Sequence, residues 1–353
     1  MKYKSMIILA LTIFVLINIA GVSAADANDT VIASDDMGEI DLSSNSIKTD
    51  DLKTSPEDTP LSQANNDEIA SVENDSEVLN VNPGTYSGLA SEIGSGGNIK
   101  LLHDYYTYDN YGSTISISDA NSVIDGNGAV IDMAGSTIRA FILNAPYVII
   151  KNLTIKNVNF DGNGGAIYFS GSGTVENCNF IDNKATGGES CGGVVYFASN
   201  GNVDSCNFTN NSAWCGGAVY FINNGEVKNS NFSNNKASKR GGGVYSQNGK
   251  VNVIKSTFIK NTASERGGGV YLNRDGEVTN CNFVNNFATN RGGAVYSEYS
   301  NVNVIKSTFI KNTASVRGGA IYFYRYGEVT NCNITNNKAT GYDSEGGAIY
   351  FMY

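Results

Sequence analysis

The sequence contains very little histidine, proline, tryptophan and charge. Of 353 residues, one is His (His103), four are Pro, one is Trp, and 16% are charged. A single histidine excludes a metal site built on several imidazoles, and no Cys-x-x-Cys pair offers a zinc site instead. The low charge and 10% aromatic content argue against a disordered chain. The net charge of −10 argues against a nucleic-acid-binding protein.

The negative charge lies almost entirely in one segment. Residues 26–77 carry 15 acids and two lysines, whereas residues 78–353 carry 20 basic and 19 acidic residues. Because residues 26–77 also lack aromatic side chains, they are predicted to form a disordered acidic spacer.

The first 25 residues have the features of an export signal. Lys2 and Lys4 precede an apolar run over residues 6–20 and a small-residue Val-Ser-Ala site at 22–24. The pattern predicts a cleaved signal peptide over residues 1–25, and therefore a secreted or cell-surface protein that meets the membrane only through this peptide. An uncleaved anchor is the alternative, although the run is short for a membrane span.

The rest of the chain is a repeat. A Gly-Gly-small-aliphatic-Tyr phrase begins at residues 164, 192, 216, 241, 267, 292, 318 and 346, and a Phe-x-x-Asn phrase alternates with it. One 14-residue stretch occurs identically at 251–264 and 302–315, which indicates duplication of a two-repeat unit. A period near 25 residues indicates units that stack, and frequent Gly and Asn disfavour helices.

The predicted fold is all-β, a parallel β-helix of about eleven turns. Short β-branched and aromatic runs supply the strands, and Gly and Asn supply corners that need a positive φ. Residues 78–163 are expected to form an N-terminal cap with a short helix near 89–93 and the first turns. Residues 164–353 are expected to form the repeat region, ending without a cap.

Period-two alternation predicts which side chains face inward. The aliphatic residue of each Gly-Gly phrase should face the core and the following Tyr should face outward. A column of small residues should also be internal: Cys178, Cys206, Ser230, Ser256, Cys281, Ser307 and Cys332. Asn side chains at equivalent corners are expected to form hydrogen-bonded ladders between turns.

The two alternating phrases resemble the repeats of the polymorphic outer-membrane proteins of chlamydiae. The whole layout, including an Ile-Asp-Gly-Asn-Gly turn at 124–128 and Asn-Leu-Thr-Ile at 152–155, is similar to adhesin-like surface proteins of methanogenic archaea. The resemblance implies a right-handed, pectate-lyase-like β-helix displayed at the cell surface for adhesion to glycans or proteins of a host or neighbouring cell. Chlamydial members end in a membrane barrel, and large methanogen members often carry wall-binding segments. Neither follows residue 353 in the sequence, so the resemblance does not predict how the protein is attached.

An enzyme is the second functional hypothesis, because polysaccharide lyases and hydrolases also use this fold. Such hydrolases need paired carboxylates, and no Gly-His-Gly loop or calcium-type aspartate cluster is visible by spacing. Asp125, Asp132 and Asp161 are the carboxylates that could converge on early turns, although turn formation explains Asp125 and Asp161 better. The sequence therefore predicts no catalysis, no cofactor and no metal. A purely structural spacer is the third hypothesis.

Two columns could bind a ligand. Arginine precedes Gly-Gly on four successive turns, at Arg240, Arg266, Arg291 and Arg317, which predicts either an anion- or sugar-binding stripe or a row neutralised by Glu265, Glu226, Glu277 and Glu328. The tyrosines of successive Gly-Gly phrases could offer an aromatic face to a ligand or stack on one another, and stacking is favoured. The tyrosines concerned are Tyr220, Tyr245, Tyr271, Tyr296 and Tyr322.

Two covalent features are also predicted. Cys191 and Cys215 lie one turn apart and are the expected disulfide, whereas Cys281 and Cys332 lie two turns apart and are too distant to bond. Glycosylation sequons within the predicted solenoid begin at Asn152, Asn207, Asn210, Asn231 and Asn333.

Overall fold

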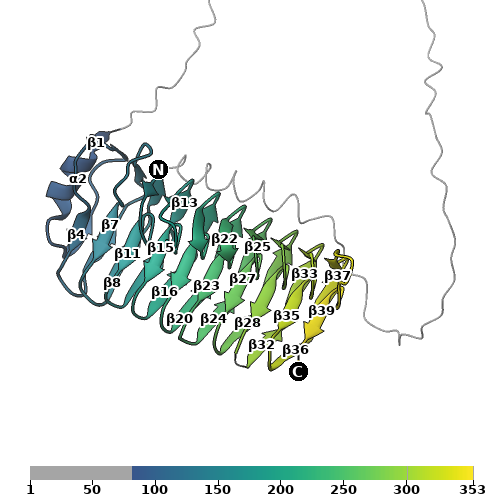
Figure 1. The fold of residues 1–353 in the computed structure, drawn as a ribbon. Helices are drawn as coiled ribbons and strands as arrows, with labels where there is room; N and C mark the ends of the chain where they lie inside the picture. The colour runs from purple at the N-terminus through teal and green to yellow at the C-terminus, as the bar shows by residue number, and fades with distance from the viewer. Residues whose placement is uncertain (1–81, 300, 353) are drawn as a thin grey trace, which may run out of the picture. The chain divides into compact units, whose positions relative to one another are not determined.

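A computed structural model describes residues 82–299 and 301–352, and these residues form a parallel β-helix with one short helix at its N-terminal end (Figure 1). The longest sheet contains 11 strands, in agreement with the predicted number of turns. The predicted signal peptide and acidic spacer lie outside the described residues.

Four parallel sheets run along the solenoid. Sheet A contains β1 (Pro83–Thr85), β3 (Tyr105–Thr107), β6 (Val130–Asp132), β9 (Thr154–Lys156), β13 (Asn179–Ile181), β17 (Asn207–Thr209), β21 (Asn231–Ser233), β25 (Thr257–Ile259), β29 (Asn282–Val284), β33 (Thr308–Ile310) and β37 (Asn333–Thr335). Sheet D contains β10 (Asn159–Phe160), β14 (Lys184–Ala185), β18 (Ser212–Cys215), β22 (Lys236–Arg240), β26 (Thr262–Ala263), β30 (Phe287–Ala288), β34 (Thr313–Ala314) and β38 (Lys338–Ala339).

The other two sheets complete each turn. Sheet C contains β4 (Ile115–Ile117), β7 (Phe141–Leu143), β11 (Ile167–Phe169), β15 (Val195–Phe197), β19 (Val219–Phe221), β23 (Val244–Ser246), β27 (Val270–Leu272), β31 (Val295–Ser297), β35 (Ile321–Phe323) and β39 (Ile349–Phe351). Sheet B contains β2 (Asn98–Lys100), β5 (Val123–Asp125), β8 (Val148–Lys151), β12 (Gly173–Glu176), β16 (Gly201–Asp204), β20 (Gly225–Lys228), β24 (Val251–Ile254), β28 (Gly276–Thr279), β32 (Val302–Ile305) and β36 (Gly327–Thr330).

The predicted N-terminal helix is present and caps the first turn. Helix α2 (Tyr86–Ile93) is capped at its N-terminus by Thr85, whose side chain accepts a hydrogen bond from the Gly88 N–H, and the helix buries Tyr86, Leu89 and Ile93. Strand β3 was not predicted, because its Tyr-Tyr-Thr sequence lacks an aliphatic run. The sheets continue without interruption from residues 82–163 into the repeat region, so the predicted boundary at 163 marks a change in sequence regularity rather than a break in the solenoid.

Gly and Asn occupy the corners with positive φ, as predicted. The corner between sheets D and C uses the first Gly of each Gly-Gly phrase, such as Gly241 with φ 66°. The second Gly is required by close packing, because a Cβ on Gly242 would collide with the Gly268 carbonyl oxygen of the next turn. The B–A and A–D corners use mostly Asn, but Lys255, Lys260, Lys306 and Lys311 also adopt positive φ there, which the sequence pattern did not indicate.

Phenylalanines on sheet A form the largest inner column. The rings of Phe180, Phe208, Phe232, Phe258, Phe283 and Phe309 are fully or almost fully buried, and successive centroids lie 4.6–5.0 Å apart. The Val or Ile of each Gly-Gly phrase packs in the same core, as predicted.

The asparagine of each Phe-x-x-Asn phrase builds a buried ladder. The Asn235 backbone N–H and Nδ2 both donate to Oδ1 of Asn261, each at 3.0 Å, while Asn261 Nδ2 donates to the Phe232 carbonyl at 2.9 Å. The same pattern repeats from Asn183 to Asn337. The ladder therefore satisfies polar groups that the A–D corner would otherwise bury without partners.

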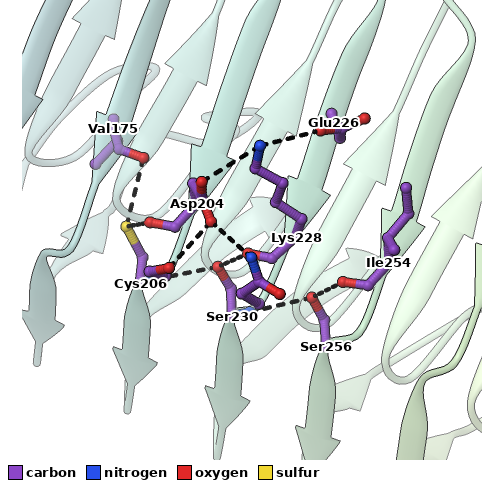
Figure 2. Close-up of polar contacts among 10 residues, drawn as sticks. Val175, Asp204, Cys206, Glu226, Lys228, Ser230, Ile254 and Ser256 are labelled. Atoms are coloured by element: carbon purple, nitrogen blue, oxygen red, sulfur yellow. Dashed lines mark hydrogen bonds and ion pairs between the residues drawn. The ribbon is translucent and has the colours of Figure 1, made fainter.

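The predicted column of small residues lines the corner between sheets B and A (Figure 2). The Cys206 N–H donates to Oγ of Ser230 at 3.1 Å, and the Ser230 N–H donates to Oγ of Ser256 at 3.2 Å. On the outer side of the same corner, Lys228 lies 3.3 Å from Asp204 and 3.7 Å from Glu226. The inner bonds tie consecutive turns together, and the outer charges neutralise one another.

Candidate functional site: the outer face of sheet C

The outer face of sheet C carries a continuous stack of tyrosines. The rings of Tyr196, Tyr220, Tyr245, Tyr271, Tyr296 and Tyr322 are nearly parallel, with successive centroids 4.6–5.0 Å apart. They form a hydrophobic cluster separate from the solenoid core, so the outward direction of these side chains is as predicted.

The tyrosines do not form an accessible aromatic face, which corrects that hypothesis. Tyr271 is 1% exposed, and Tyr296 and Tyr322 are fully buried, although they lie outside the solenoid core. Each ring is covered above and below by the next tyrosine and at its edges by side chains from the flanking corners. The alternative of mutual stacking therefore describes the tyrosine column.

Arginines line one edge of this face, at the corner between sheets D and C. Arg240, Arg266, Arg291 and Arg317 pair with one another as parallel bridges on successive turns. Each guanidinium lies over the tyrosine of the following turn; for Arg266 over Tyr296 and Arg291 over Tyr322, the distances to the ring centroids are 5.2 and 5.3 Å. Such cation–π contacts order the row and cover the stack at the same time.

Three of the four arginines have a carboxylate partner. Arg240 lies 3.2 Å from Glu265, Arg266 lies 3.1 Å from Glu298, and Arg317 lies 2.5 Å from Glu345. The prediction of a neutralised row is therefore correct for Glu265. It is wrong for Glu226, Glu277 and Glu328, which lie on sheet B and contact Lys228, Thr279 and Thr330 instead.

Arg291 has no such partner among the described residues. Its Nε is buried without a hydrogen-bond acceptor, and no carboxylate lies within ion-pair distance. The reason is visible in the sequence: Val316 occupies the position that Glu265 occupies for Arg240, and Tyr324 occupies the position that Glu298 occupies for Arg266. Arg291 is thus a positive charge on this face without a paired acid.

Glu298 is the most buried carboxylate of the face. It is 6% exposed, and it accepts hydrogen bonds from Nη1 of Arg266 at 3.1 Å and from the Tyr271 hydroxyl at 2.5 Å. Burial, the Glu298 hydrogen bond and its charge raise the pKa of Tyr271. Burial likewise raises the pKa of Tyr196 and of Tyr245 to about 12, which extends the pH range over which these hydroxyls stay neutral.

The predicted Cys191–Cys215 disulfide remains a prediction. The two residues pair as a parallel bridge on neighbouring turns, in the same column as the arginines, and both are buried free thiols in the structure. A hydrogen bond from Cys215 lowers the pKa of Cys191, whereas the Cys191 side chain and burial raise the pKa of Cys215. This arrangement places a more acidic thiol beside the sulfur with which it would bond.

The sequon asparagines differ in accessibility. Asn207, Asn210, Asn231 and Asn333 are exposed, whereas Asn152 is half-buried. Asn152 Nδ2 donates to Asp125 at 2.9 Å and its Oδ1 accepts from Asn177 at 2.8 Å. A glycan on Asn152 would therefore disturb a half-buried corner contact, whereas a glycan on Asn207 or Asn231 would disturb only an exposed hydrogen bond, to Asn179 or Asn207 respectively.

The early aspartates are held in separate corner networks. Asp125 accepts from Asn152 on sheet B's corner, whereas Asp132 accepts from Tyr105 at 2.7 Å and from Asn157 at 2.8 Å. Partial burial raises the pKa of Asp132, but these hydrogen bonds outweigh it and lower the pKa to about 2. Within residues 82–299 and 301–352, no three His, Cys, Asp or Glu side chains are grouped as metal ligands.

The opposite edge of the sheet C face contains residues that the sequence analysis did not single out. Arg274, Tyr299, Arg325 and Tyr326 lie in the loops that lead from sheet C to sheet B, and all four are exposed. The duplication offered a signal for two of them, because Arg274 and Arg325 are 51 residues apart and occupy equivalent positions of the two copies.

Four segments of the chain match the Chlamydia polymorphic membrane protein repeat: residues 229–247, 255–273, 280–298 and 306–324. This confirms the predicted chlamydial repeat for these segments. No curated protein matches the chain, and no solved structure does. Each matched segment contains one arginine of the row and one tyrosine of the stack. Within the described part of the chain, no helix has enough length and apolar character to cross a membrane.

Proposed function

We propose that this protein is an exported, adhesin-like surface protein that acts through the outer face of sheet C and performs no catalysis. Its partners are glycans or proteins on a host or neighbouring cell, and nucleic acid is not among them. The name of the matched repeat supports a membrane or surface location. The likeness to methanogen adhesin-like proteins is part of the same proposal.

The observation that carries the proposal is the unpaired guanidinium of Arg291 on an otherwise neutralised row. A face that served only as a spacer would be more stable with an acid at residue 316 or 324, because a partly buried cation gains from a partner. The neighbouring tyrosines and ion pairs fix the position of Arg291, which favours recognition over flexible contact.

The structural-spacer hypothesis retains support from the buried, self-stacked tyrosines, which make few groups available to a ligand. An adhesion assay separates the two hypotheses. Beads coated with the full chain, with Arg291→Gln or with Arg240→Gln would be incubated with a panel of microbial and animal cells. The proposal is supported if Arg291→Gln reduces adhesion at least fivefold and Arg240→Gln keeps it within twofold of the unaltered chain.

Failure of the unaltered chain to adhere to any cell in the panel would favour the spacer. Release of reducing ends from polysaccharides incubated with the same preparation would favour the enzyme hypothesis. Fractionation of the producing cells with an antibody to the solenoid tests the location, and a cytoplasmic pool of the mature chain would contradict export.

A further inference from the structure

Two arginines enclose an exposed tyrosine at the edge between sheets C and B. The guanidinium of Arg274 lies 5.7 Å from the Tyr299 ring centroid and that of Arg325 lies 5.9 Å from it, and the three residues come from successive turns. Tyr299 is 45% exposed, so the rim of its ring and the two guanidinium groups face solvent together. We call Arg274, Tyr299, Arg325 and Tyr326 the loop-edge cluster.

The charges of the loop-edge cluster are not neutralised within the described residues. Neither Arg274 nor Arg325 has an ion pair in residues 82–299 and 301–352. Glu298 precedes Tyr299 in the chain, but it points away to Arg266 and Tyr271. Asp275, the residue after Arg274, is exposed, and Glu277 and Glu328 on sheet B accept hydrogen bonds from Thr279 and Thr330. The cluster therefore presents two available cations.

A pocket adjoins one of these cations, Arg325. It is lined by Tyr324, Arg325, Tyr326 and Met352, and Tyr326 is 65% exposed. The Tyr324 ring packs edge-on against Tyr299 with centroids 6.0 Å apart, which joins the pocket to the arginine pair. An aromatic ring beside a guanidinium offers an apolar surface and charged donors within the same small area.

We propose that the loop-edge cluster binds an acidic polysaccharide chain, with Arg274 and Arg325 contacting successive acidic groups and Tyr326 packing against a sugar ring. Arg274 and Arg325 lie two turns apart, roughly 10 Å by the strand spacing of a sheet. That separation suits acidic groups that recur along a linear chain better than one small anion. Arginine binds carboxylate and sulfate through paired N–H donors, and the aromatic ring adds contact with the apolar side of a sugar.

This inference deepens the proposed function and depends on it for its biological role, but the binding itself is tested separately. A fluorescent decamer of polygalacturonate would be titrated with the full chain, alongside its neutral methyl ester and a polyglutamate peptide of equal charge. The unaltered chain should bind the polygalacturonate decamer at least tenfold more tightly than the other two probes.

Variants then locate the site. Arg274→Gln/Arg325→Gln should weaken binding of the decamer about tenfold or more, because two charge-assisted contacts are lost. The matched control is Lys260→Gln/Lys311→Gln, which removes the same charge from two exposed corner residues that are also 51 positions apart. It should change the affinity less than twofold. Tyr326→Leu should weaken binding about threefold or more, whereas Tyr342→Leu, at another exposed tyrosine, should not.

Several outcomes would overturn the inference: no binding of the decamer, equal binding of its methyl ester, or equal losses in the two double variants. Tighter binding of polyglutamate would assign the cluster to acidic peptides instead. Circular dichroism and melting curves establish that each variant is folded. If the beads adhere to cells but the decamer does not bind, the inference fails and the proposed function stands. If the decamer binds but the beads do not adhere, the inference stands and the proposed function fails.

Discussion

The phenylalanines inside sheet A and the tyrosines outside sheet C form aromatic stacks of almost the same spacing. Successive Phe232–Phe258 and Tyr245–Tyr271 rings both lie 4.6 Å apart. The phenylalanines are covered by the solenoid itself. The tyrosines are covered by arginines, by Glu298 and by neighbouring turns, so their burial depends on polar side chains that must find partners.

The difference shows how one repeat supplies both a core and a surface. Stacking sets the spacing in each case, because every turn repeats at the strand separation of a β-sheet. The phenylalanine rings of the inner stack carry no polar atoms that would need a hydrogen-bond partner. The outer stack ends in hydroxyls and guanidinium groups, and it is there that an unpaired cation, Arg291, occurs.

Removing one ring from the inner stack should have the largest effect on stability. Phe258→Ala should lower the free energy of unfolding by about 3–5 kcal/mol, because it leaves a cavity between two rings that cannot close up. Phe287→Ala is the control, since Phe287 lies on sheet D and is half-buried. Urea denaturation compares them, and equal losses would show that the inner stack is not the main source of cohesion.

The asparagine ladder beside the inner stack should come next. Asn261→Ala removes the acceptor of two Asn235 donors and the donor to Phe232, and each buried group left unpaired costs about 1–3 kcal/mol. We expect a net loss of about 2–3 kcal/mol. Asn207→Ala breaks a comparable but exposed ladder, with bonds of 2.8 and 2.9 Å, and should cost under about 1 kcal/mol.

A similar loss from Asn207→Ala and Asn261→Ala would mean that burial does not decide the strength of the ladder. The same urea titrations provide this comparison.

Deleting one hydroxyl from the outer stack should have a smaller effect. Tyr271→Phe leaves Glu298 with Arg266 as its remaining partner, and we expect a loss of about 1–2 kcal/mol. Tyr196→Phe is the control, because no hydrogen bond is found for its hydroxyl among residues 82–299 and 301–352, and it should change stability by less than about 0.5 kcal/mol. A larger loss in Tyr196→Phe would contradict the role given to Glu298.

High pH should have the smallest effect on stability, and it should act on the tyrosine stack. Burial raises the pKa of Tyr196 and Tyr245 to about 12 from the ordinary 10.0, so the unfolded chain loses these protons first. A raised pKa contributes stability below pH 10, and this contribution is lost as the pH rises towards 12. Melting curves between pH 9 and 11 should therefore show declining stability, and Tyr196→Phe/Tyr245→Phe should decline less. A parallel decline would contradict this account.

The sequence was sufficient to predict the solenoid, because its informative positions are local. Gly241 and Gly242, Phe258 and Asn261 each repeat at fixed offsets and have one structural role per turn. The small column through Cys206 and Ser230 followed from alternation in the same way. Strand β3 was missed because its Tyr-Tyr-Thr sequence carries no aliphatic pattern.

The surface was harder to predict, because it depends on which turn lies beside which. Alternation gave the outward direction of Tyr296 but not the side chains that cover it. The partner of Arg266 is Glu298, 32 residues later and on the far side of the tyrosine stack, so counting nearby acids assigned the wrong carboxylates. The placement of Tyr299 between Arg274 and Arg325 depends on how three successive turns align, and only the structure shows that alignment.

The central claim is that Arg291 makes the sheet C face a recognition surface, and an anion-dependent melting temperature tests it most directly. The full chain, Arg291→Gln and Arg240→Gln would be melted in sodium sulfate and in sodium chloride of equal ionic strength. Because sulfate also stabilises folded proteins generally, the test is the difference between variants: sulfate should raise the melting temperature of the unaltered chain and of Arg240→Gln by about 2–4 °C more than that of Arg291→Gln. An identical response of all three proteins, or no response of the unaltered chain, would contradict the account.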